Sequence, residues 1–330
     1  MNMLTRTLLH LAAGLCAAAM LGTSSRAHAA ASWTPERNVE IIVPTSPGSS
    51  QDATARLMQN VLQGRKLVSV PITIVNRPGV VGTDYLLQRA GDGHYLYIGS
   101  AVVLTNHMTG KSAIDYIDLT AVAQLFGEYI ACVVNANSAI KNGNELLERL
   151  KNDPASLSIA FATSRGNTNH VAIAQAAKAV GIDPKALKIV LFKSGGEAMT
   201  ALLGGHVDVV SSAAGTVVDH LAVGRVRALA ISSPQRMSGV LASVPTWREL
   251  GADSVASNWR NIFGPKGMTP EQIQYWEERV AHLVETDEWK RDLEKRFRAN
   301  TFMRSSESRV FLHSEHKRLK DILADLGLAK

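Results

Sequence analysis

Short apolar runs alternate with segments of helical spacing along most of this chain. Val39–Val43 is one such run, and Ala53, Leu57 and Val61 follow it at intervals of four residues. A short apolar run bounded by turn residues is typical of a buried strand, and its alternation with helices favours parallel, doubly wound sheets. We therefore predict strands at Val39–Val43, Ile72–Val75, Tyr95–Gly99, Ala121–Leu125, Ile130–Asn135, Ser158–Ala162, Lys188–Phe192, Val207–Ser211 and Ala228–Ser232.

Helical periodicity fits between most of these runs and dominates the last third of the chain. Thr269, Pro270 and Gln272 supply an N-cap, a first-turn proline and a capping box. Glycines stand where two of the earlier helices would end, a position that favours them. We predict helices at Asn144–Lys151, Thr168–Val180, Glu197–Leu203 and Thr216–Val223, at about Pro270–Arg298 with an interruption near Glu285–Glu288, and at about Glu307–Asp325.

The number of predicted strands is large for a single sheet with one switch point. A two-domain arrangement with a ligand cleft between the domains is the natural alternative. Ala121–Asn135 and Asn258–Gly264 are extended segments that could cross between the domains. We expect two doubly wound mixed sheets in an α/β fold, with residues 31–130 and 256–330 in one domain and 131–255 in the other.

The first thirty residues have the pattern of a signal peptide. Arg6 precedes an apolar stretch from about Leu8 to Leu21, and Ala27-His28-Ala29 supplies the small residues of a cleavage site. The apolar stretch is shorter than the roughly 20 residues that a membrane span needs. We expect residues 1–30 to be removed by cleavage near Ala29–Ala31 and the protein to be exported to the periplasm.

Composition excludes some classes of partner and fold. Arg6 and Arg26 are the only charges in the signal segment, so the formal charge falls from +6 to +4 when it is removed. A weakly basic chain without a run of Lys or Arg argues against nucleic acid as a partner. Because Cys132 is then the only cysteine, a disulfide within one molecule is excluded and packing must supply stability.

The enzymatic motifs that we considered are incomplete or absent in this sequence. Gly99-Ser100-Ala101 lacks the second glycine of a nucleophile elbow, and no dinucleotide or Walker A glycine pattern occurs. The histidines are scattered without zinc-ligand spacing. We therefore expect no catalytic residue, no metal and no cofactor.

Small polar residues follow several predicted strands. The first such loop leads from Val39–Val43 into a helix that opens at Asp52, and a helix N-terminus attracts anions through its free N–H groups and dipole. In an open α/β sheet, ligands bind at the carboxyl ends of the strands. The candidate ligand-binding residues are Thr45, Ser46, Pro47, Gly48, Ser49, Ser50, Ser100, Ala101, Thr105, Asn106, Thr163, Arg165, Asn167, Asn169, His170, Ser211, Ser212 and Ala213.

Each candidate also has a plainer interpretation. A single Ser or Asn in such a loop is most simply a solvated turn, and His170 is equally consistent with a hydrogen bond to a neighbouring loop and with ligand contact. Arg260 and Lys193 are the candidate cationic partners for a carboxylate. The case for a binding site therefore rests on the recurrence of these loops at helix N-termini.

The motif V-P-x-x-P-G-x-S-x-D at Val43–Asp52 resembles the first loop of the substrate-binding receptors of tripartite tricarboxylate transporters, often called Bug receptors. The resemblance extends in order along the whole mature chain to Asp325–Leu328 and is closest to the tricarboxylate-receptor branch. Further matching segments are Asn76–Gly79, Gly91–Leu96, Gly166–His170, Lys193–Ala198, Leu202–Asp208, Val244–Trp247 and Gly264–Pro270.

This resemblance implies a two-lobed periplasmic binding protein of the type II-like class. Such a receptor closes on a small carboxylate and delivers it to membrane permease subunits, and we expect a monomer. In this family the first loop, the loop matching Ser100–Asn106 and the second-domain loops matching Thr163–His170 and Ser211–Ala213 hold the carboxylate, usually with ordered waters.

Departures from the family pattern bear on the ligand. Thr45 stands where the family often has an aromatic or large apolar residue, and Ser49 stands where it often has glycine. We expect the space left by Thr45 to admit a larger or flatter acid, such as citrate or an aromatic dicarboxylate like terephthalate. Alternative functions are ligand sensing for a two-component system and a secreted hydrolase that uses Ser100 or His170.

Overall fold

The computed structural model describes residues 33–162 and 164–330. Residues Thr34–Lys330 form one compact unit. The signal peptide predicted at 1–30 and the candidate site residue Thr163 lie outside the described residues. None of the helices described is long and apolar enough to cross a membrane.

The described strands form one hydrogen-bonded network of ten, ordered β2-β1-β3-β9-β4-β7-β5-β6, with β8 and β10 each paired to β4. The predicted positions agree closely with the observed ones for the parallel strands. The bounds are β1 (Val39–Val43), β2 (Ile72–Asn76), β3 (Tyr95–Gly99), β4 (Leu119–Asn135), β5 (Ile159–Ala162), β6 (Ile189–Phe192), β7 (Val209–Ala213), β8 (Val226–Ile231), β9 (Ser257–Pro265) and β10 (Ala299–Arg304).

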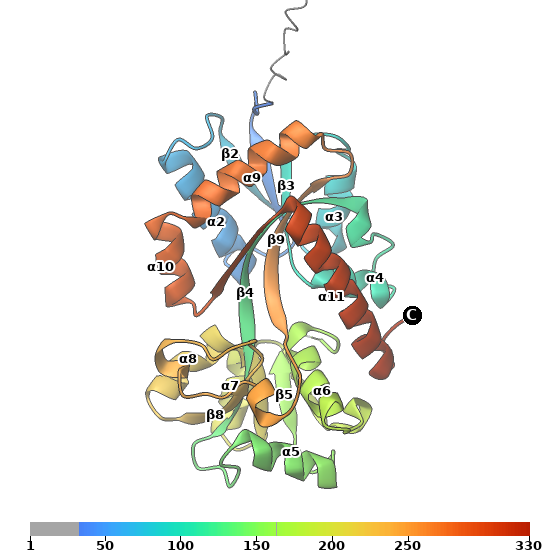
Figure 1. The fold of residues 1–330 in the computed structure, drawn as a ribbon, viewed down its shortest axis with the longest axis vertical. Helices are drawn as coiled ribbons and strands as arrows, with labels where there is room; N and C mark the ends of the chain where they lie inside the picture. Colours follow the sequence, from blue (N-terminus) through green and yellow to red (C-terminus); the bar gives the residue numbers. More distant parts are fainter. Residues whose placement is uncertain (1–32, 163) are drawn as a thin grey trace, which may run out of the picture. The chain divides into compact units, whose positions relative to one another are not determined.

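Two groups of parallel strands make two lobes. In the first lobe β1 pairs in parallel with β2 and β3, and in the second β5 pairs in parallel with β6 and β7. The long strands β4 and β9 pair antiparallel and run between the lobes (Figure 1). The predicted two-lobed α/β fold with mixed sheets and two crossing segments is thereby confirmed, whereas the proposed domain boundaries stay a prediction.

Two details of the strands differ from the prediction. Ala121–Leu125 and Ile130–Asn135 are parts of the single strand β4, which continues through Gly127 and Glu128 because these residues pair with β9. The apolar pattern misses this continuity because a charged residue interrupts it. The pattern also does not predict β10, since none of its side chains is fully buried.

The helices connect the strands and cover both lobes. The interruption predicted near Glu285–Glu288 is confirmed, because Thr286 caps a new helix by accepting a hydrogen bond from the Trp289 amide. The bounds are α2 (Ser50–Gly64), α3 (Val80–Leu87), α4 (Val102–Met108), α5 (Gly143–Asn152), α6 (Thr168–Ala179), α7 (Gly195–Leu203), α8 (Ala214–Ala222), α9 (Pro270–Val284), α10 (Asp287–Lys295) and α11 (Ser305–Asp325), with short 3-10 turns at Tyr116–Asp118, Pro184–Ala186, Gly239–Leu241 and Arg248–Leu250.

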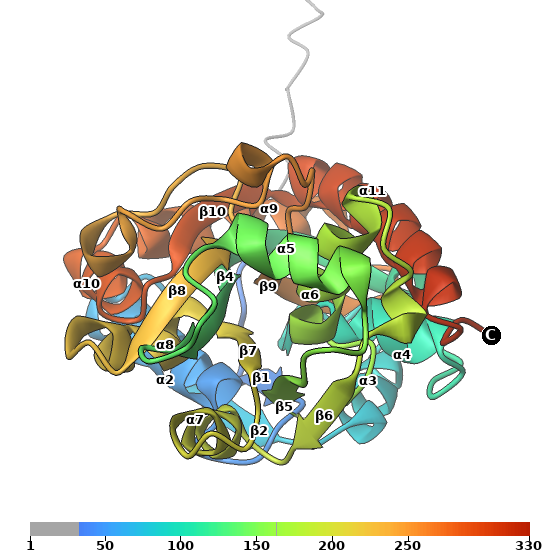
Figure 2. The ribbon, with the colours of Figure 1, turned by 90° about the horizontal axis from the view of Figure 1, so that it is seen from below.

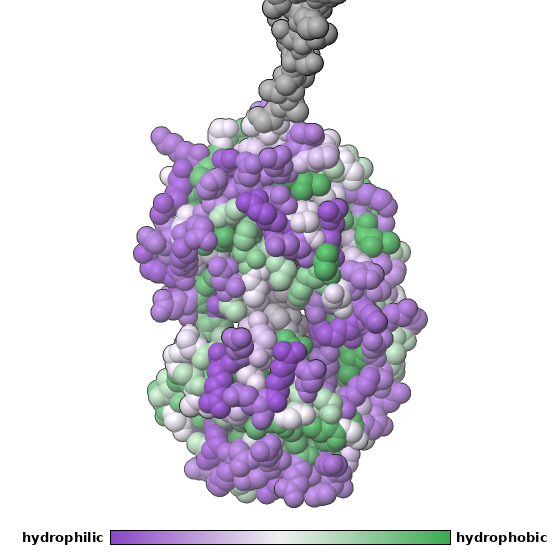
Figure 3. Space-filling view, in the orientation of Figure 1, coloured by the Kyte–Doolittle hydropathy of each residue, from purple (hydrophilic) through white to green (hydrophobic). Residues whose placement is uncertain are grey.

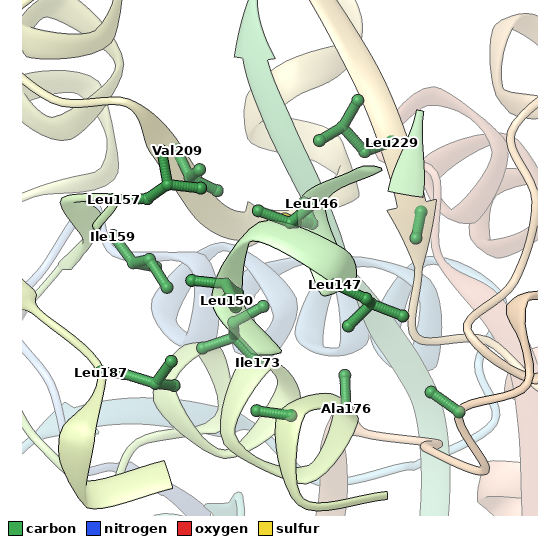
Figure 4. Packing of buried hydrophobic residues seen from close by; sticks show 14 of the residues in the cluster. Leu146, Leu147, Leu150, Leu157, Ile159, Ile173, Ala176, Leu187, Val209 and Leu229 are labelled. Atoms are coloured by element: carbon green, nitrogen blue, oxygen red, sulfur yellow. The ribbon is translucent and has the colours of Figure 1, made fainter. Parts of the chain in front are cut away.

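The second lobe buries both faces of its strands β5 and β7. Successive strand residues point to opposite faces, so Ile159 and Val209 pack with Leu150 of α5 and Ile173 of α6 (Figure 4). The next residues along the same strands, Ala160 and Val210, belong to a separate cluster with α7. Figure 2 shows α5 and α6 on one side of these strands and α7 on the other. Nearly continuous apolar strands are typical of such double cover.

The C-terminal helix α11 completes the core of the first lobe and reaches the second. Leu312 and Leu323 of α11 share one buried cluster with Leu104 of α4 and Val171 of α6. On the face shown in Figure 3, hydrophilic residues cover most of both lobes, and paler, less polar residues gather near the middle. Residues that follow β3 and β5 line a common region between the lobes.

Candidate ligand-binding site

The first loop, between β1 and α2, is held by its own small side chains. Ser49 is the N-cap of α2, and its hydroxyl accepts a hydrogen bond from the Asp52 amide at 3.2 Å. The Thr45 and Ser49 hydroxyl oxygens are 2.6 Å apart. Gly48 has a φ of +82°, a left-handed conformation that favours glycine. The loop residues predicted from the sequence therefore shape this helix N-terminus.

The Asp52 carboxylate holds this loop in place through hydrogen bonds. Asp52 is buried, and its carboxylate accepts hydrogen bonds from the Gly48 amide at 2.9 Å, from Asn76 Nδ2 at 3.0 Å and from Arg56 Nε at 2.9 Å. The hydrogen bond from Arg56 is the main cause that lowers the pKa of Asp52 to about 2. The carboxylate is therefore ionised at neutral pH and acts as an acceptor for the loop backbone.

Two adjoining cavities lie at the ends of the strands and share Gln51, Ser100 and Val102 in their walls. The first, of about 90 Å³, lies within the first lobe and is lined by residues that include Thr45, Thr83 and Tyr97. The second, of about 240 Å³, has walls from both lobes. Its other lining residues are Ala101, Thr105, Gly166, Asn167, Thr168, Asn169, Asn258, Arg260 and Leu319.

The structure brings part of the predicted set together around these cavities. Thr45 and Asn106 line the first cavity and Ala101, Thr105, Asn167 and Asn169 line the second, while Ser100 lines both. The other described candidates lie outside both linings, and their ligand roles stay predictions. They are Ser46, Pro47, Gly48, Ser49, Ser50, Arg165, His170, Ser211, Ser212 and Ala213.

His170 lies beneath the wall of the second cavity. It is 1% exposed, its Nδ1 accepts a hydrogen bond from the Gly166 amide at 2.9 Å, and its ring stacks on Phe161. Burial, with a smaller contribution from the charge of Arg165, lowers its pKa to about 4, so the imidazole is neutral at neutral pH. The hydrogen bond to a neighbouring loop is thus present, and His170 positions the Gly166–Asn169 segment.

Ser211 and Ser50 also act on neighbouring groups rather than on the cavity walls. The Ser211 hydroxyl is buried and donates a hydrogen bond to the Asn169 carbonyl at 2.8 Å. The Ser50 hydroxyl accepts a hydrogen bond from Arg298 Nη2 at 2.8 Å. Ser211 therefore supports the wall residue Asn169, and Ser50 ties the start of α2 to Arg298.

Sequence reasoning missed several wall residues. Gln51 lines both cavities, and its Nε2 donates to the Ile98 carbonyl at 3.1 Å, which ties α2 to the end of β3. Asn258 comes from the crossing strand β9, and Leu319 from α11. Gln51 had a usable signal, since it follows the first loop directly. No sequence signal indicated Leu319, because only the packing of α11 across the lobes places this residue in the wall.

Of the two candidate cations, Arg260 lines the second cavity, whereas Lys193 lines neither. Arg260 is 5% exposed and its Nη2 stands 3.5 Å from Glu128 Oε2. The wall thus combines hydroxyl and amide groups, the N-terminus of α6 and one guanidinium, all of which favour an anion. Within residues 33–162 and 164–330, no group of three or more His, Cys, Asp or Glu could hold a metal ion.

The comparison with known families decides the class of this protein. The family model of tripartite tricarboxylate transporter family receptors matches residues 54–328. The chain belongs to this receptor family. Protein BugT of Bordetella pertussis is 31% identical over 247 residues, which cover 72% of this chain and 74% of that protein. The resemblance inferred from the sequence motifs is therefore confirmed.

Solved structures share the fold of this receptor. A TctC solute binding protein from Polaromonas superposes with a TM-score of 0.78 at 23% identity, covering 88% of this chain and 99% of that chain. Rpa4515 of R. palustris, solved with adipate, superposes with a TM-score of 0.73 at 21% identity, covering 89% of this chain and 99% of that chain. MatC from Rhodopseudomonas palustris, with bound malate, superposes with a TM-score of 0.66 at 23% identity, covering 88% of this chain and 99% of that chain. The family is one of transporter receptors, which supports a binding function for this protein.

Proposed function

We propose that this protein is a periplasmic receptor that captures a di- or tricarboxylate between its lobes and delivers it to the permease of a tripartite tricarboxylate transporter. The observation that carries the proposal is the second cavity. Small polar residues at the strand ends of both lobes, such as Ser100 and Asn167, meet around it. Adipate in Rpa4515 and malate in MatC show that two proteins of this fold bind dicarboxylates.

The wall of the cavity suits a carboxylate. The first N–H groups of α6 have no partner within the helix, and the Ser100 hydroxyl comes from the opposite lobe. Each charge-assisted hydrogen bond contributes about 1.5–3 kcal/mol. A ligand that contacts both lobes stabilises the closed arrangement, and the closed arrangement offers the permease a surface that the open one lacks.

Thr45 supports a preference for a larger or flatter acid. It lines the first cavity, which adjoins the second at Gln51, Ser100 and Val102, so a small residue here leaves room beyond the carboxylate site. Ser49 lies behind it and bonds to its hydroxyl. We propose citrate-like or aromatic dicarboxylate ligands, terephthalate among them.

Calorimetric titration with malate, adipate, citrate and terephthalate tests the function. We expect at least one of these acids to bind the wild-type protein, and Ser100→Asp to abolish that binding because it places a like charge beside the ligand. Ser238→Asp is the control, since Ser238 is exposed and lies outside both cavities. Unchanged affinity in Ser100→Asp would refute the site, and binding only by the small acid malate would refute the size preference.

The export and delivery steps have their own tests. Mass analysis of the protein purified from periplasm should give an N-terminus near Ala29–Ala31. Deletion of the chromosomal gene should abolish uptake of the bound acid, and the Ser100→Asp gene should not restore it. Normal uptake in the deletion strain would contradict delivery to a permease and leave sensing as the alternative.

A further inference from the structure

Arg260 is a buried cation in the wall of the cavity between the lobes. Its side chain is 6% exposed. Nη1 donates to Asn258 Oδ1 at 2.9 Å and to the Trp259 carbonyl at 3.1 Å. Within residues 33–162 and 164–330, Nε has no hydrogen-bond partner, and Nη2 has only the ion pair with Glu128 at 3.5 Å. Nη2 is therefore the nitrogen that is available to a further acceptor, while Nε is buried within the wall.

Glu128 does not fully balance this charge, because it is engaged elsewhere. Its Oε1 accepts a hydrogen bond from Arg298 Nε at 2.8 Å, and its Oε2 accepts one from Asn258 Nδ2 at 3.1 Å. Two buried guanidinium groups thus share this carboxylate. Arg298 also pairs with Asp292 at 3.1 Å, whereas the ion pair of Arg260 is the longer 3.5 Å contact with Glu128. Burial lowers the pKa of Arg260; the charge of Glu128 opposes this shift, and the charge of Arg298 adds to it more weakly.

A buried charge with incomplete pairing is costly, and an anion placed beside it removes that cost. The planar guanidinium matches a carboxylate with two parallel hydrogen bonds, which an ammonium group cannot do. The other anion-attracting groups of the same cavity, Ser100 and the start of α6, belong to different elements. The wall of this cavity therefore has anion-attracting groups from both lobes in addition to Arg260.

We propose that Arg260 binds a second acid group of the ligand, so that the cleft selects dianionic acids over monoanionic acids of the same shape. The inference rests on the proposed function and specifies its substrate class. It adds a specificity-determining role for a residue of the crossing strand β9, beyond the strand-end loops.

Pairs of diacids and their monoamides test this selection, because each pair has the same length and shape but differs by one charge. Adipate and terephthalate, each with its monoamide, are titrated calorimetrically against the wild-type protein and Arg260→Gln. We expect the wild type to bind a diacid more than about tenfold more tightly than its monoamide, in line with a charge-assisted pair. Arg260→Gln should lose about tenfold in affinity for the diacid and change little for the monoamide.

Two further variants separate recognition from folding. Arg227→Gln is the matched control, since Arg227 donates to the Ala136 and Ile140 carbonyls and lies outside the cavity; its diacid preference should equal that of the wild type. Arg260→Lys keeps the charge but loses the fork, so we expect a reduced preference for the diacid. This variant also provides the measurement if Arg260→Gln does not fold.

Different outcomes test the proposed receptor function and the role of Arg260. Failure of the wild type to bind any of the acids tested would overturn the proposed function. Binding of diacid and monoamide with equal affinity by the wild type would overturn only the role of Arg260. Equal losses for both ligands in the folded Arg260 variants would likewise assign Arg260 a structural role and overturn the selection.

Discussion

Asp52 shows how a residue outside the cavity walls can shape a binding loop. Its carboxylate receives the Gly48 amide and the Asn76 side chain, and Asn76 also donates to the Thr45 carbonyl at 3.0 Å. The loop that contains Thr45 is therefore tied both to β2 and to the first turn of α2. Loss of this carboxylate charge should loosen the loop as a whole.

We predict that Asp52 makes stability fall in acid. Its folded pKa, about 2, lies below the ordinary value of 3.8, so its contribution is complete above pH 3.8 and is lost as the pH falls through 2. Urea unfolding at pH 7 and pH 2.5 should show wild type losing about 1–2 kcal/mol more than Asp52→Asn. Asp253→Asn, which changes an exposed carboxylate, should behave as wild type. An equal loss in wild type and Asp52→Asn would contradict this role.

The sequence predicts some wall residues and misses others for a physical reason. Ser100 directly follows β3, and Asn167 and Asn169 lie in the loop and first turn of α6 that follow β5, so their place near the carboxyl ends of strands follows from the pattern. Asn258 and Glu128 face each other because β4 and β9 pair in register across 130 residues. Local pattern contains no information about that pairing.

The N-terminus of α6 lines the second cavity, and its N-cap residue is Asn167. Asn167 accepts a hydrogen bond from the His170 amide at 3.0 Å and donates to the Ala162 carbonyl at 2.6 Å, which joins β5 to α6. Asn142 caps α5 in the same way, with the Glu145 amide at 2.9 Å, but α5 lies outside both cavities. Asn142 is therefore a suitable control for Asn167, because both are N-cap residues but only Asn167 lines a cavity.

We predict that Asn167→Ala and Asn142→Ala each lower the free energy of unfolding by about 1 kcal/mol, because each removes an N-cap. Only Asn167→Ala should weaken binding of the acid identified by titration, since only that cap lines the cavity. Thermal unfolding and calorimetry measure the two effects separately. Equal ligand affinity in both variants would show that the α6 N-terminus does not contact the ligand.

The helix α11 joins the lobes in addition to β4 and β9 (Figure 1). Its C-terminal part packs on α6, and a side chain added at Gly166 would meet Leu323 Cδ2 at 3.0 Å. The Lys330 amide donates to the Met108 carbonyl of α4 at 2.9 Å. The amphipathic pattern predicts a helix here, but not that it packs on both lobes, because this depends on where the crossing strands lead.

We therefore expect the lobes to unfold together, with Leu323 as one of the residues that couple them. Leu323→Ala leaves a cavity in the cluster shared by α4, α6 and α11 and should lower the free energy of unfolding by about 2–4 kcal/mol. Val310→Ala, on an exposed position of the same helix, should change it little. Urea unfolding followed by circular dichroism and by tryptophan fluorescence should give coincident transitions in the wild type. Separate transitions would show that each lobe is stable alone and that α11 does not couple them.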